Sequence, residues 1–98
     1  PVENSETVRQ RVITAYNIQI KRQNALNMSL SAKQLEQYAP LDPPAQKMIE
    51  LAQQKLNLSA RGYHRILRVA RTIADLHQSP DIQTGHLSEA LSYRGQHI

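Results

Sequence analysis

The segment from Leu58 to Leu76 (LSARGYHRILRVARTIADL) constrains the fold more than any other stretch of the sequence. On a helix of 3.6 residues per turn, its apolar side chains recur at the i, i+3, i+4, i+7 spacing of a buried face. These inward positions are Tyr63, Ile66, Leu67, Ala70, Ile73 and Ala74. Ser59 is the expected N-cap, because its hydroxyl can accept a hydrogen bond from the first turn. The segment therefore predicts a long amphipathic helix at the centre of the fold.

The opposite side of this helix carries a row of arginines. Arg61, Arg65 and Arg68 follow the i, i+4, i+7 spacing, and Arg71 falls at the edge of the row. All four are arginine rather than lysine, and arginine is suited to bidentate contact with phosphate. Arg61 lies in the first turn, where the helix dipole favours an anion, and Gly62 beside it leaves room for a close approach. The row therefore indicates an anion-binding surface.

A charged helix face also has a simpler explanation, which the sequence leaves open. The arginines can pair with Asp75 and Glu50, or remain hydrated without binding any partner. The formal net charge of +4 is mild, so it permits a polyanionic partner but does not require one.

A first helix is predicted from Asn4 or Ser5, either of which can act as the N-cap, to about Leu26. Its apolar arc is wide, because two neighbouring strips of the helix surface carry apolar residues. One strip holds Val8, Val12, Ala15 and Gln19, and the other holds Ile13, Tyr16 and Ile20.

Two further helices follow, each with a clear start signal. Ser31 and Gln34 form the capping box of a short helix that stops before Pro40. Asp42 caps the next helix, and the two prolines after it occupy a first turn in which a missing N–H costs nothing. The inward side chains of this helix are expected to be Ala45, Met48, Ile49, Ala52 and Leu56.

The chain is expected to end in one more helix. The predicted helix that carries the arginine row ends near residues 77–78, because Pro80 cannot continue it. Thr84 can then cap a last helix, which Gly95 closes. Its inward residues are Leu87, Ala90 and Leu91. No run alternates with the period of two that marks a strand. The prediction for residues 1–98 is a single all-α domain, a small bundle of four to five helices.

Several kinds of site are absent from the sequence. Without cysteine there is no disulfide or thiolate metal site, which fits a reducing, cytoplasmic location. The four histidines lack metal-binding spacing, and the three glycines lie too far apart to form a phosphate-binding loop. No apolar run is long enough to span a membrane. We therefore expect this chain alone to bind no metal and no nucleotide, and to have no membrane partner.

The segment S-A-R-G-Y-H-R-I-L-R-V-A-R-T-I-A-D-L, with I-x3-H-L-x-E-A-L-x-Y-R from Ile82 to Arg94, resembles a known family. That family is the C-terminal domain of the magnesium-chelatase-like AAA+ ATPases of the ComM/YifB type. The first predicted helix agrees, with R-V-x2-A at Arg11 to Ala15. It also carries the matching residues Gln19, Arg22 and Asn24. One departure is Tyr16, where the family pattern would have arginine.

The resemblance implies a helical lid that follows the α/β core of a ring-forming, hexameric ATPase. The Walker motifs and the bound ATP with Mg²⁺ would then belong to the parent protein upstream of this chain. Arg61, in the context Ser59-Ala60-Arg61, would be the sensor-two arginine that reaches the γ-phosphate, and Arg65 would be the next candidate. Arg68 and Arg71 would contact the core domain or a neighbouring subunit. The same group is associated with DNA branch migration, a helicase-like activity, during natural transformation.

Two other classes of function stay open at this stage. A direct DNA-binding module could use a loose helix–turn–helix between the last two helices, although Arg94 would be its only basic reader there. A plain interaction bundle could instead dock the arginine row on an acidic partner. Salt-dependent DNA binding by the isolated domain would favour the first of these alternatives.

Overall fold

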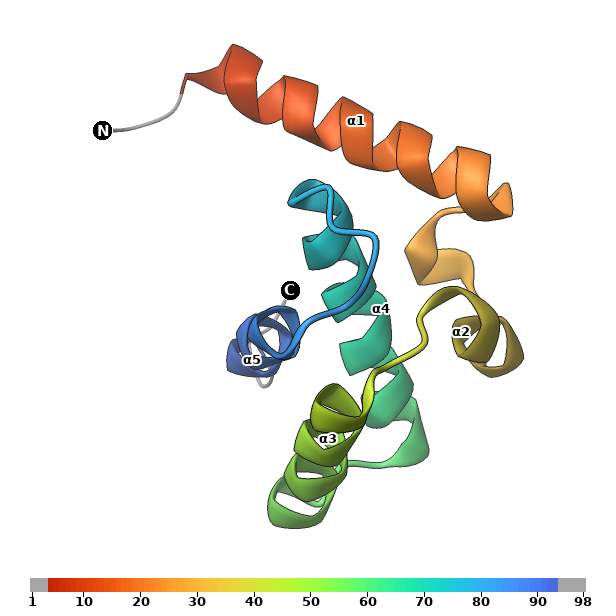
Figure 1. The fold of residues 1–98 in the computed structure, drawn as a ribbon, viewed down its shortest axis with the longest axis vertical. Coiled ribbons are helices and arrows are strands. Elements are labelled where there is room, and N and C mark those ends of the chain that lie inside the picture. The colour runs from red at the N-terminus through yellow and green to blue at the C-terminus, as the bar shows by residue number, and fades with distance from the viewer. Residues whose placement is uncertain (1–3, 94–98) are drawn as a thin grey trace.

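Helix α4 (Ala60–Leu76) lies at the centre of the fold, and the other helices pack around it (Figure 1). The computed structural model describes residues 4–93 of the chain. The other elements are α1 (Ser5–Gln23), the short 3₁₀ helix η1 (Asn27–Ser29), α2 (Ala32–Tyr38), α3 (Pro43–Leu56) and α5 (Thr84–Ser92). Within residues 4–93 there is no strand, only an isolated parallel bridge between Leu41 and Ile82. The predicted all-α bundle is confirmed.

Side-chain caps fix where four of the helices begin, as the sequence predicts. The capping residues are Asn4, Ser31, Asp42 and Ser59. In each case a side-chain oxygen accepts a hydrogen bond from the backbone N–H three residues further on, at 2.7–3.2 Å. These bonds satisfy N–H groups that have no partner inside the helix. Local sequence alone therefore sets these boundaries.

Two boundaries differ from the prediction. Helix α1 ends at Gln23 rather than near Leu26, because Asn24 adopts a left-handed backbone conformation with φ of 54° that stops the helix. The N-cap of α5 is Gln83, and Thr84 is already the first helical residue. Here the Nδ1 atom of His86 accepts the backbone N–H of Gln83 at 2.9 Å. The predicted end at Gly95 lies outside the described residues.

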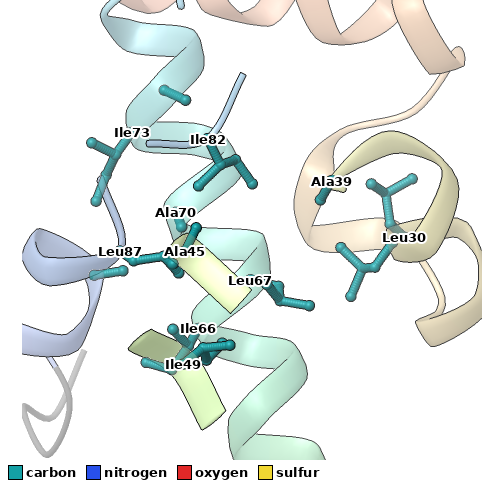
Figure 2. Close-up of a cluster of buried hydrophobic side chains, with 13 residues drawn as sticks. Leu30, Ala39, Ala45, Ile49, Ile66, Leu67, Ala70, Ile73, Ile82 and Leu87 are labelled. Carbon is teal, nitrogen blue, oxygen red and sulfur yellow. The ribbon is translucent and has the colours of Figure 1, made fainter. Parts of the chain in front are cut away.

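The apolar core is built on α4 by α2, α3, α5 and the segments that connect them (Figure 2). Its buried members are Leu30, Leu35, Ala39, Ala45, Ile49, Ile66, Leu67, Ala70, Ile73, Ala74, Ile82, Leu87 and Ala90. Tyr63, Met48 and Leu91, which the periodicity also places inward, are partly buried against this cluster. Leu56 was expected inside but is exposed, because it is the last residue of α3. No residue of α1 belongs to the cluster.

Two features that would bear on function are absent from residues 4–93. None of their helices combines the length and the hydropathy needed to cross a bilayer. Residues 4–93 also bring together no group of three or more histidine, aspartate or glutamate side chains able to hold a metal ion.

Candidate functional site

The structure divides the four arginines of α4 into two pairs. Arg61 and Arg65 are exposed and make no hydrogen bond or ion pair with the described part of the chain. Arg68 and Arg71, on the later turns, both bind groups of this same domain. The single row predicted from the sequence is therefore limited to its first two members.

Arg71 is fully enclosed, although its spacing places it at the edge of the arginine row, and it pairs with Asp75 as the simpler explanation of that row allows. Its side chain is only 2% exposed, and Nη2 lies 3.0 Å from Oδ1 of Asp75, one turn further along α4. The chain after α4 folds back over it, and Arg71 donates to the backbone oxygens of Ser79 at 2.8 Å and Pro80 at 3.2 Å. Because its partners lie inside the domain, Arg71 is not available for the expected contact with another domain or subunit.

Arg68 is partly buried and also has an internal partner. Its Nε donates to the backbone oxygen of Leu30 at 3.0 Å, which joins α4 to the segment between η1 and α2. This bond satisfies a buried backbone acceptor that no helix or strand pairs. Much of the guanidinium's orientation is thus set by the fold.

A buried polar cluster joins α1 to α4, and the sequence did not predict it. Arg22 of α1 binds the carboxylate of Asp75 in a bidentate manner, through Nη1 to Oδ1 at 2.9 Å and Nη2 to Oδ2 at 3.1 Å. Asp75 is 1% exposed, so one buried carboxylate faces the guanidiniums of both Arg22 and Arg71. The only sequence signal for the Arg22 contact is the match of Gln19 and Arg22 to the family pattern.

Asn27 completes this cluster from η1. Its Nδ2 donates to Oδ2 of Asp75 at 2.9 Å and to the hydroxyl of Thr72 at 3.1 Å. Its backbone N–H donates to the side chain of Gln19 at 2.9 Å, and its own Oδ1 accepts from Arg22 at 3.0 Å. Every member therefore fixes another, which sets the angle at which α1 crosses α4.

The charge state of Asp75 follows from these contacts. Burial acts to raise the pKa of Asp75, because it penalises the charged form. Hydrogen bonds from Arg22 and Asn27, together with the positive charges of Arg71 and Arg22, outweigh that effect and hold the pKa below its ordinary value of 3.8. Asp75 is therefore an anion at neutral pH and the counter-charge for both arginines.

The first turn of α4 is the most open cationic region of this helix. Ser59 caps it and Arg61 projects from it, while Arg65 follows one turn later on the same side. A phosphate placed here would meet two guanidiniums and the positive end of the helix dipole. The site suits the phosphates of a nucleotide but offers no carboxylate set for Mg²⁺ among residues 4–93.

A hollow of about 390 Å³ lies beside this turn, between α2, α3 and α4. Its lining is Ala32, Leu35, Glu36, Ala39, Pro40, Leu41, Gln46, Tyr63, His64 and Leu67. The rings of Tyr63 and His64 meet edge to face, with centroids 5.6 Å apart. Arg61 and Arg65 do not line the hollow, so it is separate from the cationic turn.

Gly62 lies in the first turn of α4, directly after Arg61. A Cβ at Gly62 would meet nothing closer than Oγ of Ser59 at 3.5 Å, so the fold does not require glycine here. Gly62→Ala is expected to leave the free energy of unfolding unchanged or raise it by up to about 1 kcal/mol, because alanine favours the helix. Urea denaturation of the 98-residue chain checks this, and a clear loss of stability would show that the fold itself needs Gly62.

The segment between the last two helices, which the sequence offered as the turn of a helix–turn–helix, makes contacts within the domain instead. Residues 77–83 connect α4 to α5, and they include the carbonyl groups that bind Arg71 and the bridge from Ile82 to Leu41. This connector is thus packed against the domain. Arg94, the expected basic reader, lies outside the described residues.

Comparison with known proteins identifies the domain. Residues 2–94 match the family model for the C-terminal domain of magnesium chelatase subunit ChlI. The chain is 46% identical over 94 residues to the uncharacterized protein YifB of Escherichia coli, covering 96% of this chain and 19% of that protein. It is 44% identical over 92 residues to the competence protein ComM of Haemophilus influenzae, covering 94% of this chain and 18% of that protein.

A second YifB, from Salmonella typhimurium, is 41% identical over 92 residues, again 94% of this chain and 18% of the relative. The chain thus spans slightly less than one fifth of the length of the curated relatives it matches. The match covers every helix described above, from α1 to α5. The chain therefore belongs to the magnesium chelatase ChlI C-terminal domain family.

Proposed function

We propose that this domain is the helical lid of a magnesium-chelatase-like AAA+ ATPase and that Arg61 is its sensor-two arginine. The observation that carries the proposal is the position of Arg61, exposed in the first turn of α4 without an internal partner, while Arg68 and Arg71 serve the fold. The family membership supplies the setting. The parent protein would hold ATP with Mg²⁺ on an upstream core domain, and the lid would close over it.

In this proposal the lid contributes positive charge to the nucleotide site. Mg-ATP, held by the rest of the parent protein, supplies the phosphoryl group that is transferred to water. Arg61 donates hydrogen bonds to oxygens of the γ-phosphate and offsets negative charge there. Arg65, one turn further along α4, is the second contact. Because α4 is also the core of the domain, both guanidiniums are carried by a rigid element.

The same rigidity would couple the nucleotide to the rest of a ring. The Arg22–Asp75 contact ties α1 to α4, so the helices move together when the lid responds to bound nucleotide. Neighbouring subunits of a homo-oligomeric ring, a hexamer by family resemblance, would receive that motion. One relative is named a competence protein, which supports placing the parent activity in DNA branch migration during transformation.

Direct DNA binding and binding of an acidic partner would have fewer exposed arginines to use than the sequence indicates. A DNA surface or an acidic-partner surface on α4 would have to rely on Arg61 and Arg65 alone, since Arg71 is buried and Arg68 is bound to Leu30. Two exposed cations provide a weak footprint for a polyanion.

The proposal predicts that the 98-residue chain neither binds nor hydrolyses ATP appreciably, because the Walker motifs lie elsewhere in the parent protein. An NMR titration with Mg-ATP, and separately with short DNA, measures this at low and physiological salt. Unshifted amides from residue 59 to residue 68 in both titrations are the expected result. ATP turnover by this chain alone would contradict the lid assignment, and saturable, salt-sensitive shifts with DNA would favour a nucleic-acid surface instead.

A further inference from the structure

One strip of α1 is buried along half of its length and exposed along the other half. Val8, Val12, Ala15 and Gln19 follow one another at helical spacing, so they lie on the same side of the helix. Ala15 and Gln19 are buried against the domain, whereas Val8 is 45% and Val12 is 53% exposed. Figure 1 shows α1 at one end of the molecule, outside the other helices. The first turns of α1 thus extend beyond the surface on which its later turns pack.

A neighbouring strip adds two more exposed apolar side chains. Ile13 is 40% and Tyr16 is 50% exposed. Tyr16 lies one turn beyond Val12, and Ile13 lies three residues before Tyr16, so Tyr16 adjoins both on the helix surface. We define the α1 face as Val8, Val12, Ile13 and Tyr16. Single exposed apolar residues are ordinary, whereas four adjoining ones on one helix form an apolar surface of the kind that contacts other proteins.

Helix α1 is attached to the domain in a way that fixes the position of its exposed first turns. Ala15 is the only buried apolar residue of α1, and it lies outside the core cluster. The helix is held near its other end by the bidentate contact of Arg22 with Asp75 and by Gln19. That contact fixes the direction of α1 without covering its first turns. The polar attachment therefore presents the α1 face at a defined angle.

The charges around the α1 face indicate the chemistry of what covers it. Between Glu6 and the end of α1 at Gln23 the sequence has no carboxylate, while Arg9 lies in the same strip as Ile13 and Tyr16. The complementary surface is therefore apolar and bordered by carboxylates. A second copy of the α1 face would bring the same cations and, apart from Glu6, no carboxylate. Nucleic acid would supply anions but would leave valine side chains against phosphate.

We propose that the α1 face docks on the nucleotide-binding core of the same protein, on an apolar surface bordered by carboxylates. The choice of that occupant rests on the proposed function, and the relatives, of which this domain is less than one fifth, have ample further chain to provide such a surface. In this arrangement α4 presents Arg61 to the nucleotide, and α1 holds the lid on the core at a second place.

The absence of cysteine from this chain allows a site-specific test. Val12→Cys places a thiol within the α1 face, and Thr7→Cys places one at an exposed position whose neighbours at i+3 and i+4, Gln10 and Arg11, lie outside that face. Each variant is made in the 98-residue chain and in the full-length parent protein. Alkylation of the peptide that carries the thiol is then followed by mass spectrometry. Tyr16→Cys repeats the measurement at a second position of the face.

We expect alkylation of Val12→Cys to be about tenfold slower in the parent protein than in the 98-residue chain, because docking must open before the thiol can react. Thr7→Cys should react alike in both. Equal rates for Val12→Cys and Tyr16→Cys in the two proteins would overturn the proposal. So would slowing that appears in the 98-residue chain as its concentration rises, which indicates self-association, or slowing that requires added DNA.

This labelling assay does not depend on ATP turnover, so it separates the two proposals. Protection of residue 12 in a parent protein whose ATPase is indifferent to Arg61 would support docking and remove the sensor assignment. Equal alkylation of residue 12 in both proteins, together with the expected fall in ATPase activity of Arg61→Ala, would overturn the docking proposal and support the sensor assignment.

Discussion

Replacing Asp75 with alanine is expected to lower the free energy of unfolding of the 98-residue chain by about 3–5 kcal/mol. The reason is that one carboxylate balances two guanidiniums. Without it, Arg71, which is 2% exposed, is left as a buried cation, and Arg22 loses both of its bonds to α4. Urea denaturation followed by circular dichroism measures the change. We also expect α1 to separate from the other helices before the core unfolds, because Ala15 is its only buried apolar residue and lies outside the core cluster.

Glu36→Ala is the matched control, because Glu36 is an exposed carboxylate on α2. Its loss should change the free energy of unfolding by less than about 0.5 kcal/mol. Asp75→Asn keeps the shape of the side chain but removes its charge, so its stability should lie between the other two. If Asp75→Ala unfolded at the same urea concentration as the unsubstituted chain, the buried cluster would not hold the fold together.

The same carboxylate predicts an acid-sensitive stability. The pKa of Asp75 is lowered in the folded state, so the unfolded state takes up its proton at a higher pH than the folded state does. Its stabilising contribution is therefore complete above the ordinary pKa of 3.8 and is lost as pH falls through the lower, folded pKa. Burial, with the charges of His77 and Arg71, also lowers the pKa of His86, so stability should begin to decline below 6.5. In Asp75→Ala, the loss of stability that begins below pH 3.8 should disappear, whereas the decline below pH 6.5 should remain.

Replacing Arg61 with alanine in the parent protein is expected to lower the turnover number for ATP by about 10²–10³-fold. Arg61 is exposed and makes no hydrogen bond or ion pair with the described residues, so the fold should be unchanged. The loss would therefore come from the missing positive charge at the γ-phosphate. Steady-state phosphate release at saturating Mg-ATP measures it, and the thermal unfolding of the variant confirms that the domain is intact.

Two further variants show whether the effect is specific to this position. Lys33→Ala removes an exposed cation of α2 and should leave turnover as it is. Arg65→Ala should give a smaller loss than Arg61→Ala, because it lies one turn further from the start of α4. Wild-type turnover by Arg61→Ala would remove Arg61 from the nucleotide site. An equal loss in Lys33→Ala would point to a general effect of net charge.

Features that depend on neighbouring residues could be predicted from the sequence. Asn4, Ser31, Asp42 and Ser59 cap their helices as expected, because a cap involves residues only three positions apart. The buried face of α4 also follows from spacing, since Ile66, Leu67, Ala70, Ile73 and Ala74 all enter the core. Both kinds of prediction use information within one or two turns of helix.

Features that depend on distant parts of the chain could not be predicted in the same way. Arg22 and Asp75 are 53 residues apart, and nothing in either local pattern indicates that they meet. Arg71 lies at the margin between the two faces of α4, and only the path of residues 79 and 80 over it decides that it is buried. The wide apolar arc of α1 was evident, but not that half of it would lack a partner within the domain.

The candidate site could also be predicted from the sequence only in part. The position of Arg61 beside a capped helix start follows from the sequence, and the structure leaves that arginine exposed. The internal partners of Arg68 and Arg71 could be identified only from the tertiary structure, because their acceptors are backbone oxygens of other segments. What Arg61 contacts in the parent protein stays a prediction.

The most direct test of the central claim compares two nucleotides that differ in one phosphate. Isothermal titration calorimetry would measure the affinity of the parent protein for ADP and for a non-hydrolysable ATP analogue, each with Mg²⁺, before and after Arg61→Ala. If Arg61 binds the γ-phosphate, the variant should lose affinity for the ATP analogue and keep its affinity for ADP. An identical change for both nucleotides, or no change for either, would contradict the assignment of Arg61 as the arginine that senses ATP.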